Sequence, residues 1–318
     1  MLLKGAGNVI DVINVPALYF FKRVLEIKEY YMIRSVSIQF RQGDSSCMPI
    51  IRDIVDFLRK KNIRVMLQDD DLLENDPCAG FITGDSEMAG QADLAIAIGG
   101  DGTFLRTARL FAESGKPIFG INRGRLGFLT EFSPDEYPVY LEKIISGEYS
   151  TVDRIALEAV HFRNGIEGEH LCFLNDAVIS KGAFSRAIRL EICIDNKFLN
   201  SFSGDGIIVC TATGSTAYSL SAYGPIITPS ASQVYLINPV CPHTLAMRPM
   251  ILPVSSEVRV RIVSELKNLL LTIDGQEAIR IEGNDEVVFR ESTTRVRLIP
   301  HPEKDYYAIL REKLGWGN

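Results

Sequence analysis

The sequence has no apolar run long enough to span a bilayer, no CxxC pair, and only four histidines in 318 residues. The histidines are scattered, which argues against a zinc site. The net charge of −6 excludes a broad surface for nucleic acid, so any phosphate must be held in a local site. The cysteines fit reduced, buried thiols in a cytoplasmic protein; they are Cys47, Cys78, Cys172, Cys193, Cys210 and Cys241.

A secretory leader is not expected either. The apolar run of residues 15–21 contains Pro16 and is followed by Lys22 and Arg23, whereas a signal peptide carries its positive charge before the apolar part. We therefore interpret residues 1–31 as an N-terminal extension. The first clear strand follows Met32, which makes Met32 a candidate for the native start.

What the sequence does contain is a first half in which strands and helices alternate. Such alternation is typical of a doubly wound, mostly parallel sheet. The run of acidic residues 69–71 is expected to be a solvated loop. Strands are predicted over residues 33–40, 64–68, 92–98 and 117–121, and helices over residues 48–60, 137–146 and the segment that follows residue 102.

The second half consists mostly of predicted strands separated by turn dipeptides, and it closes with a helix over residues 306–314. The strands are predicted over residues 155–163, 171–180, 188–194, 198–202, 234–237, 258–263, 269–273, 278–281, 287–289 and 296–300. We therefore expect an α/β domain with a doubly wound parallel sheet over residues 32–150 and a β-rich, β-sandwich-like domain over residues 151–300. Residues 301–318 are expected to return to the first domain.

The segment of residues 98–109, IGGDGTFLRTAR, has the physical features of a phosphate cradle. Its glycines let backbone N–H groups approach an anion, and the start of the following helix adds partial positive charge. Arg106 lies near this cradle in sequence, either to meet phosphates or as an ordinary surface arginine. Asp101 would repel phosphate, so it needs another role: a helix N-cap, or a general base toward an attacking hydroxyl.

Two further segments are rich in polar side chains. Asn175 and Asp176 stand in the middle of a predicted strand, where they would either bind a ribose diol or mark a turn or an edge strand. Residues 203–229 lead from a strand into a run of Thr, Ser and Gly that offers many close donors, and Tyr218 offers a flat face for a base.

These three segments, in this order, resemble the NAD kinases. The pattern is GGDGT at residues 99–103, Asn-acid at residues 175–176, and DGxxxxTxTGSTAYxxSA at residues 205–222, and the resemblance extends from about residue 32 to about residue 311. Residues 122–128 (NRGRLGF) and 274–276 also resemble family segments. The resemblance implies an ATP-dependent kinase that phosphorylates the 2′-hydroxyl of the adenosine ribose of NAD to give NADP.

The resemblance also implies roles for individual residues. Asp101 would be the catalytic carboxylate near the 2′-hydroxyl, and Phe128 would line the NAD pocket. Asn175 and Asp176 would hold the adenosine side of NAD, and Asp205 would face the nicotinamide carboxamide. The phosphates would lie on a turn built by Gly99, Gly100, Gly102 and Thr103, and the adenine end would contact Thr216, Ala217, Tyr218 and Ser221.

The chain departs from the family pattern at three positions. Asp176 replaces the usual glutamate, Ala212 replaces a proline, and Tyr223 replaces a glycine of the common SAGGP segment. If that glycine takes a positive φ, Tyr223 is expected to be strained.

No carboxylate cluster in the sequence defines a metal site, so Mg²⁺ is expected to arrive with ATP. We expect a cytoplasmic protein that binds no nucleic acid and no membrane, and the resemblance implies a homodimer or homotetramer. Two alternatives remain: a lipid kinase that shares the GGDGT motif, and an NAD or NADP sensor that has lost turnover. The phosphoryl donor (ATP or polyphosphate) and the use of NADH are open.

Overall fold

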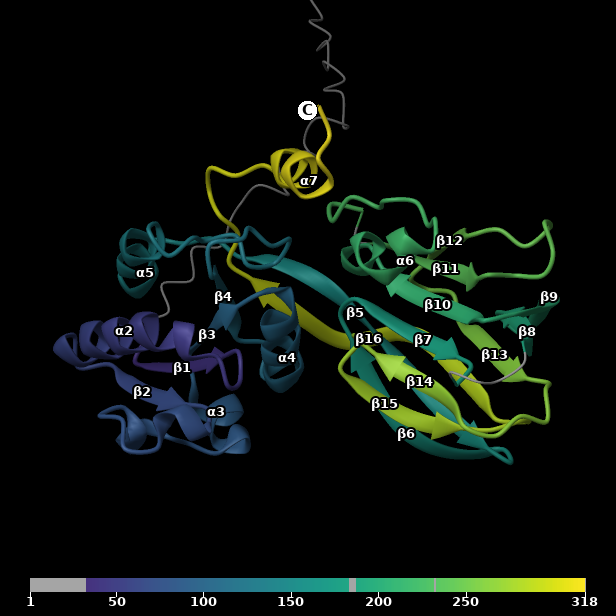
Figure 1. Cartoon of the computed structure of the whole chain (residues 1–318), viewed down its shortest axis with the longest axis horizontal. Coiled ribbons are helices and arrows are strands. Elements are labelled where there is room, and N and C mark those ends of the chain that lie inside the picture. The colour runs from purple at the N-terminus through teal and green to yellow at the C-terminus, as the bar shows by residue number, and fades with distance from the viewer. Residues whose placement is uncertain (1–32, 183–186, 232, 318) are drawn as a thin grey trace, which may run out of the picture. The chain divides into compact units, whose positions relative to one another are not determined.

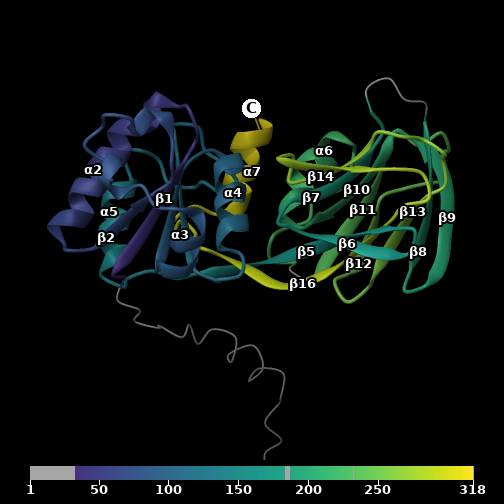
Figure 2. The same ribbon diagram turned by 90° about the horizontal axis from the view of Figure 1, so that it is seen from below.

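The computed structural model describes residues 33–182, 187–231 and 233–317, and these described residues form one compact unit. The predicted N-terminal extension over residues 1–31 lies outside the described residues. Within the unit, an α/β part is followed by a part made mostly of strands, and both are seen in Figures 1 and 2.

The first part is a doubly wound parallel sheet, as predicted. Its strands lie in the order β2-β1-β3-β4, and every neighbouring pair is parallel. Helices α2 and α5 cover one face, whereas α3 and α4 cover the other (Figure 1). The bounds are β1 (Ser35–Phe40), α2 (Met48–Lys60), β2 (Arg64–Leu67), α3 (Asp85–Gln91), β3 (Leu94–Gly99), α4 (Asp101–Phe111), β4 (Pro117–Asn122) and α5 (Tyr137–Ile145).

The alternation of large and small residues in β3 explains how the helices are placed. Ile96 and Ile98 point to the face covered by α2 and α5, whereas Ala95 and Ala97 point to the face where α4 packs. The small alanines leave room for Phe104 of α4, which is fully buried. The end of β3 and the start of α4 are thereby held together by a packed core.

The second part is built from two sheets with a shared core. One is an antiparallel sheet in the order β12-β11-β10-β7-β14-β15, and the other continues the first sheet through β16, β13, β8 and β9, with β5 and β6 attached. The bounds are β5 (Val152–Arg163), β6 (Ile166–Phe173), β7 (Asp176–Ser180), β8 (Ile188–Ile194), β9 (Lys197–Gly204), β10 (Gly206–Thr211), β11 (Val234–Val240), β12 (Met250–Pro253), β13 (Val258–Ile262), β14 (Leu269–Ile273), β15 (Glu277–Ile281) and β16 (Glu286–Leu298). Buried residues from both sheets, such as Leu157, Ile179 and Phe289, form the core.

Strand β16 belongs to both parts. It pairs antiparallel with β5 along its length and with β13 over its first residues, and its last residues also pair parallel with β4, Leu298 opposite Ile118. The prediction of two strands here was wrong, because β16 continues through an irregularity between Glu291 and Arg295. The short strand β12 was not predicted. The domain boundaries at residues 150 and 300 stay a prediction, because one sheet runs through both parts.

The chain ends in helix α7 (Tyr306–Leu314), which was predicted with these bounds. Asp305 caps its start by accepting hydrogen bonds from the N–H groups of Tyr307 and Ala308. Just before the helix, Lys304 donates to the carbonyl oxygen of Glu131 and to the carboxylate of Glu136, at 2.8 and 2.7 Å. These contacts attach α7 to the segment that follows β4.

Candidate active site

Asp101 is the first residue of α4, directly after the turn in which β3 ends. Gly100 occupies the N-cap position, and no side chain caps this helix. The Asp101 carboxylate instead accepts hydrogen bonds from the N–H groups of Phe128 (3.0 Å), Leu129 (3.0 Å) and Thr130 (3.2 Å). The capping interpretation of Asp101 is therefore wrong, because the loop after β4 supplies the partners of its carboxylate.

Two glycines make this arrangement sterically feasible. A Cβ atom on Gly127 would lie 2.2 Å from Oδ1 of Asp101, and one on Gly99 would lie 2.3 Å from Oγ1 of Thr103. Both distances are far below a van der Waals contact. The role of Gly127 was not recognised from the sequence, although it belongs to the NRGRLGF segment.

A pocket of about 280 Å³ opens beside the GGDGT turn. It brings together four of the residues predicted to bind phosphate: Gly100, Gly102, Thr103 and Arg106. The Arg106 guanidinium donates to the carbonyl oxygen of Phe40 at 3.1 Å and to the side-chain oxygen of Gln68. Burial lowers the pKa of Arg106 from its usual value. The remaining lining residues are Arg41, Gln42 and Gln276.

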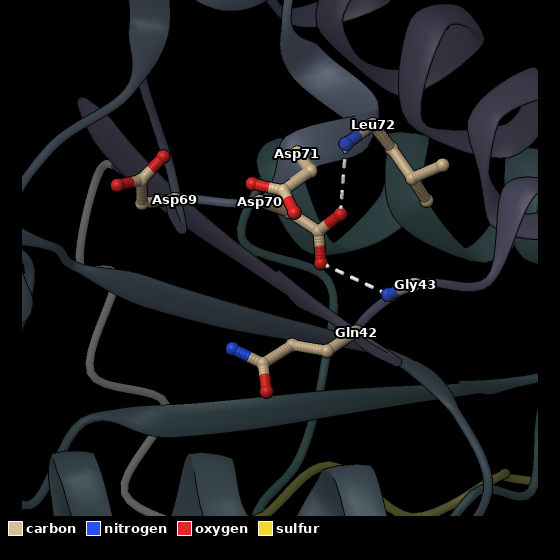
Figure 3. A pocket seen from close by; sticks show the side chains of 6 residues that line it. All are labelled: Gln42, Gly43, Asp69, Asp70, Asp71 and Leu72. Carbon is tan, nitrogen blue, oxygen red and sulfur yellow. Dashed lines mark hydrogen bonds between the residues drawn. The ribbon is translucent and has the colours of Figure 1, made fainter.

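Figure 3 shows the residues that line a second, acidic pocket of about 410 Å³. Gln42 lines both pockets. Asp69, Asp70 and Asp71 line the acidic pocket, and the Asp70 carboxylate accepts from the N–H groups of Gly43 and Leu72, both at 3.0 Å. The predicted solvated loop is thus partly ordered, since Asp70 caps a short 3₁₀ helix (Asp71–Leu73). Carboxylates repel phosphate, so the pocket lined by arginines is the better place for a phosphoryl donor.

Asn175 and Asp176 lie at a break between two strands. The prediction that they stand in the middle of one strand was therefore wrong. Strand β6 ends at Phe173 and β7 begins at Asp176. The Asp274 carboxylate accepts hydrogen bonds from the N–H groups of Leu174 (3.2 Å), Asn175 (2.7 Å) and Asp176 (3.1 Å). The break forms because these three N–H groups bond to a side chain in place of a neighbouring strand.

The polar atoms at this break are well placed for a ligand. Oδ1 of Asn175 is buried and has no hydrogen-bond partner within the described protein. Burial, and next the nearby Asp274 carboxylate, raise the pKa of Asp176 to about 7. Burial also raises the pKa of Asp274. Near neutral pH, Asp176 can therefore either donate or accept a hydrogen bond.

The Thr/Ser/Gly-rich segment packs directly against this break. Thr211 donates through its Oγ1 to the carbonyl oxygen of Leu174 (2.5 Å) and through its N–H to that of Asn175 (3.0 Å). A Cβ atom on Gly214 would lie 2.0 Å from the carbonyl oxygen of Asn175. The segment then enters the one-turn helix α6 (Tyr218–Ser221), where Tyr218 is 47% exposed. Thr216 and Ala217 are half-buried, and Ser221 is exposed.

Asp205 is not brought to this group of residues. It precedes β10, whereas Thr211 ends that strand, and the Asp205 carboxylate forms an ion pair with Lys181 at 2.7 Å. In the pairing of β10 with β7, Gly206 lies opposite Ser180 and Cys210 opposite Asp176. Asp205 is therefore five residues along the strand from Cys210, the residue opposite Asp176, or roughly 17 Å.

Phe128 lies next to Asp101, and Tyr223 follows helix α6. The Phe128 ring lies 6.2 Å from the ring of Tyr306, and Nζ of Lys313 lies 6.0 Å from its centre, so α7 covers this side. Tyr223 has a φ of 60° and is 95% exposed. The expected strain at Tyr223 is confirmed, because a tyrosine occupies the left-handed region that favours glycine.

Other features of the described residues concern metals, cysteines and membranes. No group of three or more His, Cys, Asp and Glu side chains in the described ranges is arranged to hold a metal ion. The six cysteines are free thiols. No helix between residues 33 and 317, as far as the structure describes them, has the length and apolar character needed to cross a membrane.

Comparison with known protein families gives two matches along the chain. Residues 81–149 match the ATP-NAD kinase N-terminal domain, and residues 174–301 match the ATP-NAD kinase C-terminal domain. The NAD kinase of Syntrophotalea carbinolica is 39% identical over 292 residues, which cover 90% of this chain and 99% of the relative. The NAD kinase of Aquifex aeolicus is 43% identical over 226 residues, which cover 71% of this chain and 82% of that protein.

Solved structures with a similar fold carry related names. A yeast NADH kinase complexed with NADH superposes with a TM-score of 0.81 at 27% identity, over 90% of this chain and 88% of that one. An NAD kinase from Archaeoglobus fulgidus in complex with ATP has a TM-score of 0.68 at 21% identity, over 88% and 97% of the two chains. At that identity, the second likeness concerns the fold alone.

Proposed function

The chain belongs to the ATP-NAD kinase family, and from this premise we propose that it transfers the γ-phosphoryl group of ATP to the adenosine ribose of NAD. The 2′-oxygen of the ribose forms a bond to the γ-phosphorus, the bond from that phosphorus to the β–γ bridging oxygen breaks, and NADP and ADP leave. The observation that carries the proposal is the position of Asp101, at the start of α4 and held by the N–H groups of Phe128, Leu129 and Thr130 beside the pocket of the GGDGT turn.

Asp101 would accept the proton of the 2′-hydroxyl as that oxygen attacks. A ribose hydroxyl is a weak nucleophile at neutral pH, and a positioned carboxylate contributes typically ~10²–10⁴-fold as general base. The loop N–H groups and the Thr130 hydroxyl fix the carboxylate, but only the Phe128 N–H bonds to Oδ2, so this oxygen can still accept the proton. Most of the remaining acceleration must come from positioning and from neutralising phosphate charge.

The donor phosphates would lie in the pocket lined by Gly100, Gly102, Thr103 and Arg106, with Gly99 shaping the turn behind it. Backbone N–H groups at the start of α4 and the two arginines of this pocket supply positive charge. Mg²⁺ would enter as part of the substrate, bound to the phosphates of ATP, since the described residues do not gather a metal-binding cluster.

The acceptor would lie at the break before β7. The unpartnered Oδ1 of Asn175 and the carboxyl group of Asp176 are suited to the hydroxyls of a ribose. Phe128 would line the pocket. The adenine end would contact the segment that packs against the break: Thr216, Ala217, Tyr218 and Ser221.

We also propose that the enzyme is a cytoplasmic homodimer or homotetramer. The free thiols fit a reducing compartment. Asp205 lies at the far end of β10 from Thr211, so a role for Asp205 in NAD binding requires either a long reach of the ligand or a second copy of the chain. Light scattering on the eluting peak of a gel-filtration column measures the oligomeric state.

The decisive experiment is NADP formation from NAD and MgATP, detected with an NADP-specific dehydrogenase. Polyphosphate is tested as a second donor, and NADH as a second acceptor because a yeast NADH kinase has a similar structure. We expect Asp101→Asn to lower kcat by ~10²–10⁴-fold with NAD binding largely retained. The control is Asp135→Asn, which changes an exposed carboxylate in the loop before α5 and is expected to be neutral.

Other outcomes have definite meanings. Turnover of Asp101→Asn near the wild-type value would contradict the assignment of the base. NAD binding without turnover by any donor would indicate a sensor, and phosphorylation of a lipid in the absence of NAD would indicate a lipid kinase.

A further inference from the structure

The hairpin between β14 and β15 reaches from the second part of the molecule to the first turn of α4. Its central residues Asp274 and Gly275 have φ values of 50° and 65°, as in a type I′ turn. This tight turn places Gln276 against the helix. Nε2 of Gln276 donates to the carbonyl oxygen of Gly102 at 2.6 Å, so the contact reaches the residue directly after Asp101.

Arg109 completes the contact from the helix side. Its Nη2 donates to Oε1 of Gln276 at 2.6 Å, and its guanidinium also lies 3.4 Å from the carboxylate of Glu277 and 3.8 Å from that of Asp274. Positions 102 and 109 are seven apart and therefore lie on one face of the helix. The Arg109 side chain is 16% exposed, so it is largely removed from solvent. We call the set Gly102, Arg109 and Gln276 the clasp.

The same turn also holds the acceptor side. The Asp274 carboxylate accepts from the N–H groups of Asn175 and Asp176, and the Asp274 N–H donates to the carbonyl oxygen of Asp176 at 2.8 Å. A continuous series of contacts thus runs from the Gly102 carbonyl group, next to Asp101, through the Asp274–Gln276 turn to the two residues proposed to bind the ribose.

We propose that Gln276 and Arg109 are positioning residues that set the distance between the Asp101 carboxylate and the ribose held by Asn175 and Asp176. The inference rests on the proposed function and adds to it the residues that join the two sides of the site. Asp101 comes from one part of the chain and Asn175–Asp176 from the other, so their spacing depends on contacts across the junction. An error of about 1 Å in such spacing can lower turnover by ~10²-fold.

Two substitutions separate the bonds of the clasp. Gln276→Glu keeps an acceptor for Arg109 but places a carboxylate oxygen against the Gly102 carbonyl, and Gln276→Leu removes both bonds. The matched control is Arg280→Gln, an exposed position on the same hairpin. We expect both Gln276 variants to lower kcat about 10- to 100-fold, with KM for NAD and Tm near the wild-type values and the control unchanged.

The Asp101→Asn background distinguishes positioning from general stabilisation. If the clasp acts through Asp101, Gln276→Leu should lower kcat much less in Asp101→Asn than in the wild type. An equal fold loss in the two backgrounds would overturn the proposal. So would a Gln276→Leu enzyme whose kcat stays within about twofold of the wild type.

Amide hydrogen exchange tests the clasp without any assay of activity. Gln276→Leu should speed exchange in residues 101–106 and 174–176 relative to both the wild type and Arg280→Gln. Unchanged exchange in these segments would overturn the inference. If the wild type makes NADP and the Gln276 variants behave like Arg280→Gln, the inference alone is refuted. If the wild type makes no NADP, the proposed function is refuted together with the positioning role.

Discussion

At the scale of single residues, Asp176 is the group whose charge should matter most for pH dependence. Its pKa is raised to about 7 by burial and by Asp274, whereas a free aspartate titrates near 4. When the pH lies between these two pKa values, the folded chain holds a proton that the unfolded chain has released. The contribution of Asp176 to the free energy of unfolding is therefore fully present at low pH and is lost as the pH rises through about 7.

The expected result is a pH-dependent difference between wild type and Asp176→Asn. From pH 5 to pH 8, the wild type should lose roughly 2–3 kcal/mol more of its free energy of unfolding than the variant. Urea unfolding at the two pH values measures this difference. Equal losses in the two proteins would show that Asp176 ionises at an ordinary pH.

Tyr223 is the second residue with an unusual environment. Its φ of 60° carries a strain of ~1–2 kcal/mol, and its ring is too exposed to regain much of that by packing. We therefore expect Tyr223→Gly to raise the free energy of unfolding by up to about 1 kcal/mol. This is the relief of strain minus the stabilisation of the unfolded chain by the extra conformational entropy of glycine. Thermal unfolding of the variant and the wild type measures this difference. A clear fall in Tm in Tyr223→Gly would mean that the Tyr223 ring is covered in the native assembly.

At the scale of elements, the loop after β4 must approach Asp101 closely. A methyl group at position 127 would collide with Oδ1 of Asp101 and, at 2.3 Å, with Oγ1 of Thr130. Gly127→Ala should therefore displace the carboxylate and lower kcat at least about tenfold. Gly90→Ala is the control, since a Cβ there has nothing within 4 Å in helix α3, and it should stabilise the helix by about 0.5–1 kcal/mol. Wild-type turnover in Gly127→Ala would contradict the tight fit.

Hydrophobic periodicity predicted those elements whose residues alternate or repeat regularly. The bounds of α2, β14 and α7 were predicted to the residue, because their apolar faces are set by local spacing. The break before β7 could not be predicted, since it depends on the carboxylate of Asp274, nearly a hundred residues later. The partners of Asp101 were also missed. They too lie far along the chain, and they are backbone N–H groups of a loop, which any residue type could supply.

At the scale of the whole molecule, Asp205 offers a test of assembly. If Asp205 serves the site of a neighbouring copy, Asp101→Asn and Asp205→Asn chains should complement each other when unfolded and refolded together. Random pairing into dimers would give back about a quarter of the wild-type sites. NADP formation by the mixture, compared with each variant refolded alone, measures this recovery, and no recovery would mean that Asp205 does not act across subunits.

Strand β16 has a consequence for how the chain folds during its synthesis. Phe132 bridges the later part of the β4 edge at Ile121, but Pro117 and Ile118 at its start find their strand partners only in residues 297 and 298, close to the end of the chain. While the ribosome is still making the second part, the start of that edge has open backbone groups, and it stays open until almost every residue has emerged. The α/β half should therefore mature late despite being made first, and a nascent chain stalled before residue 286 should depend on chaperones to stay out of aggregates.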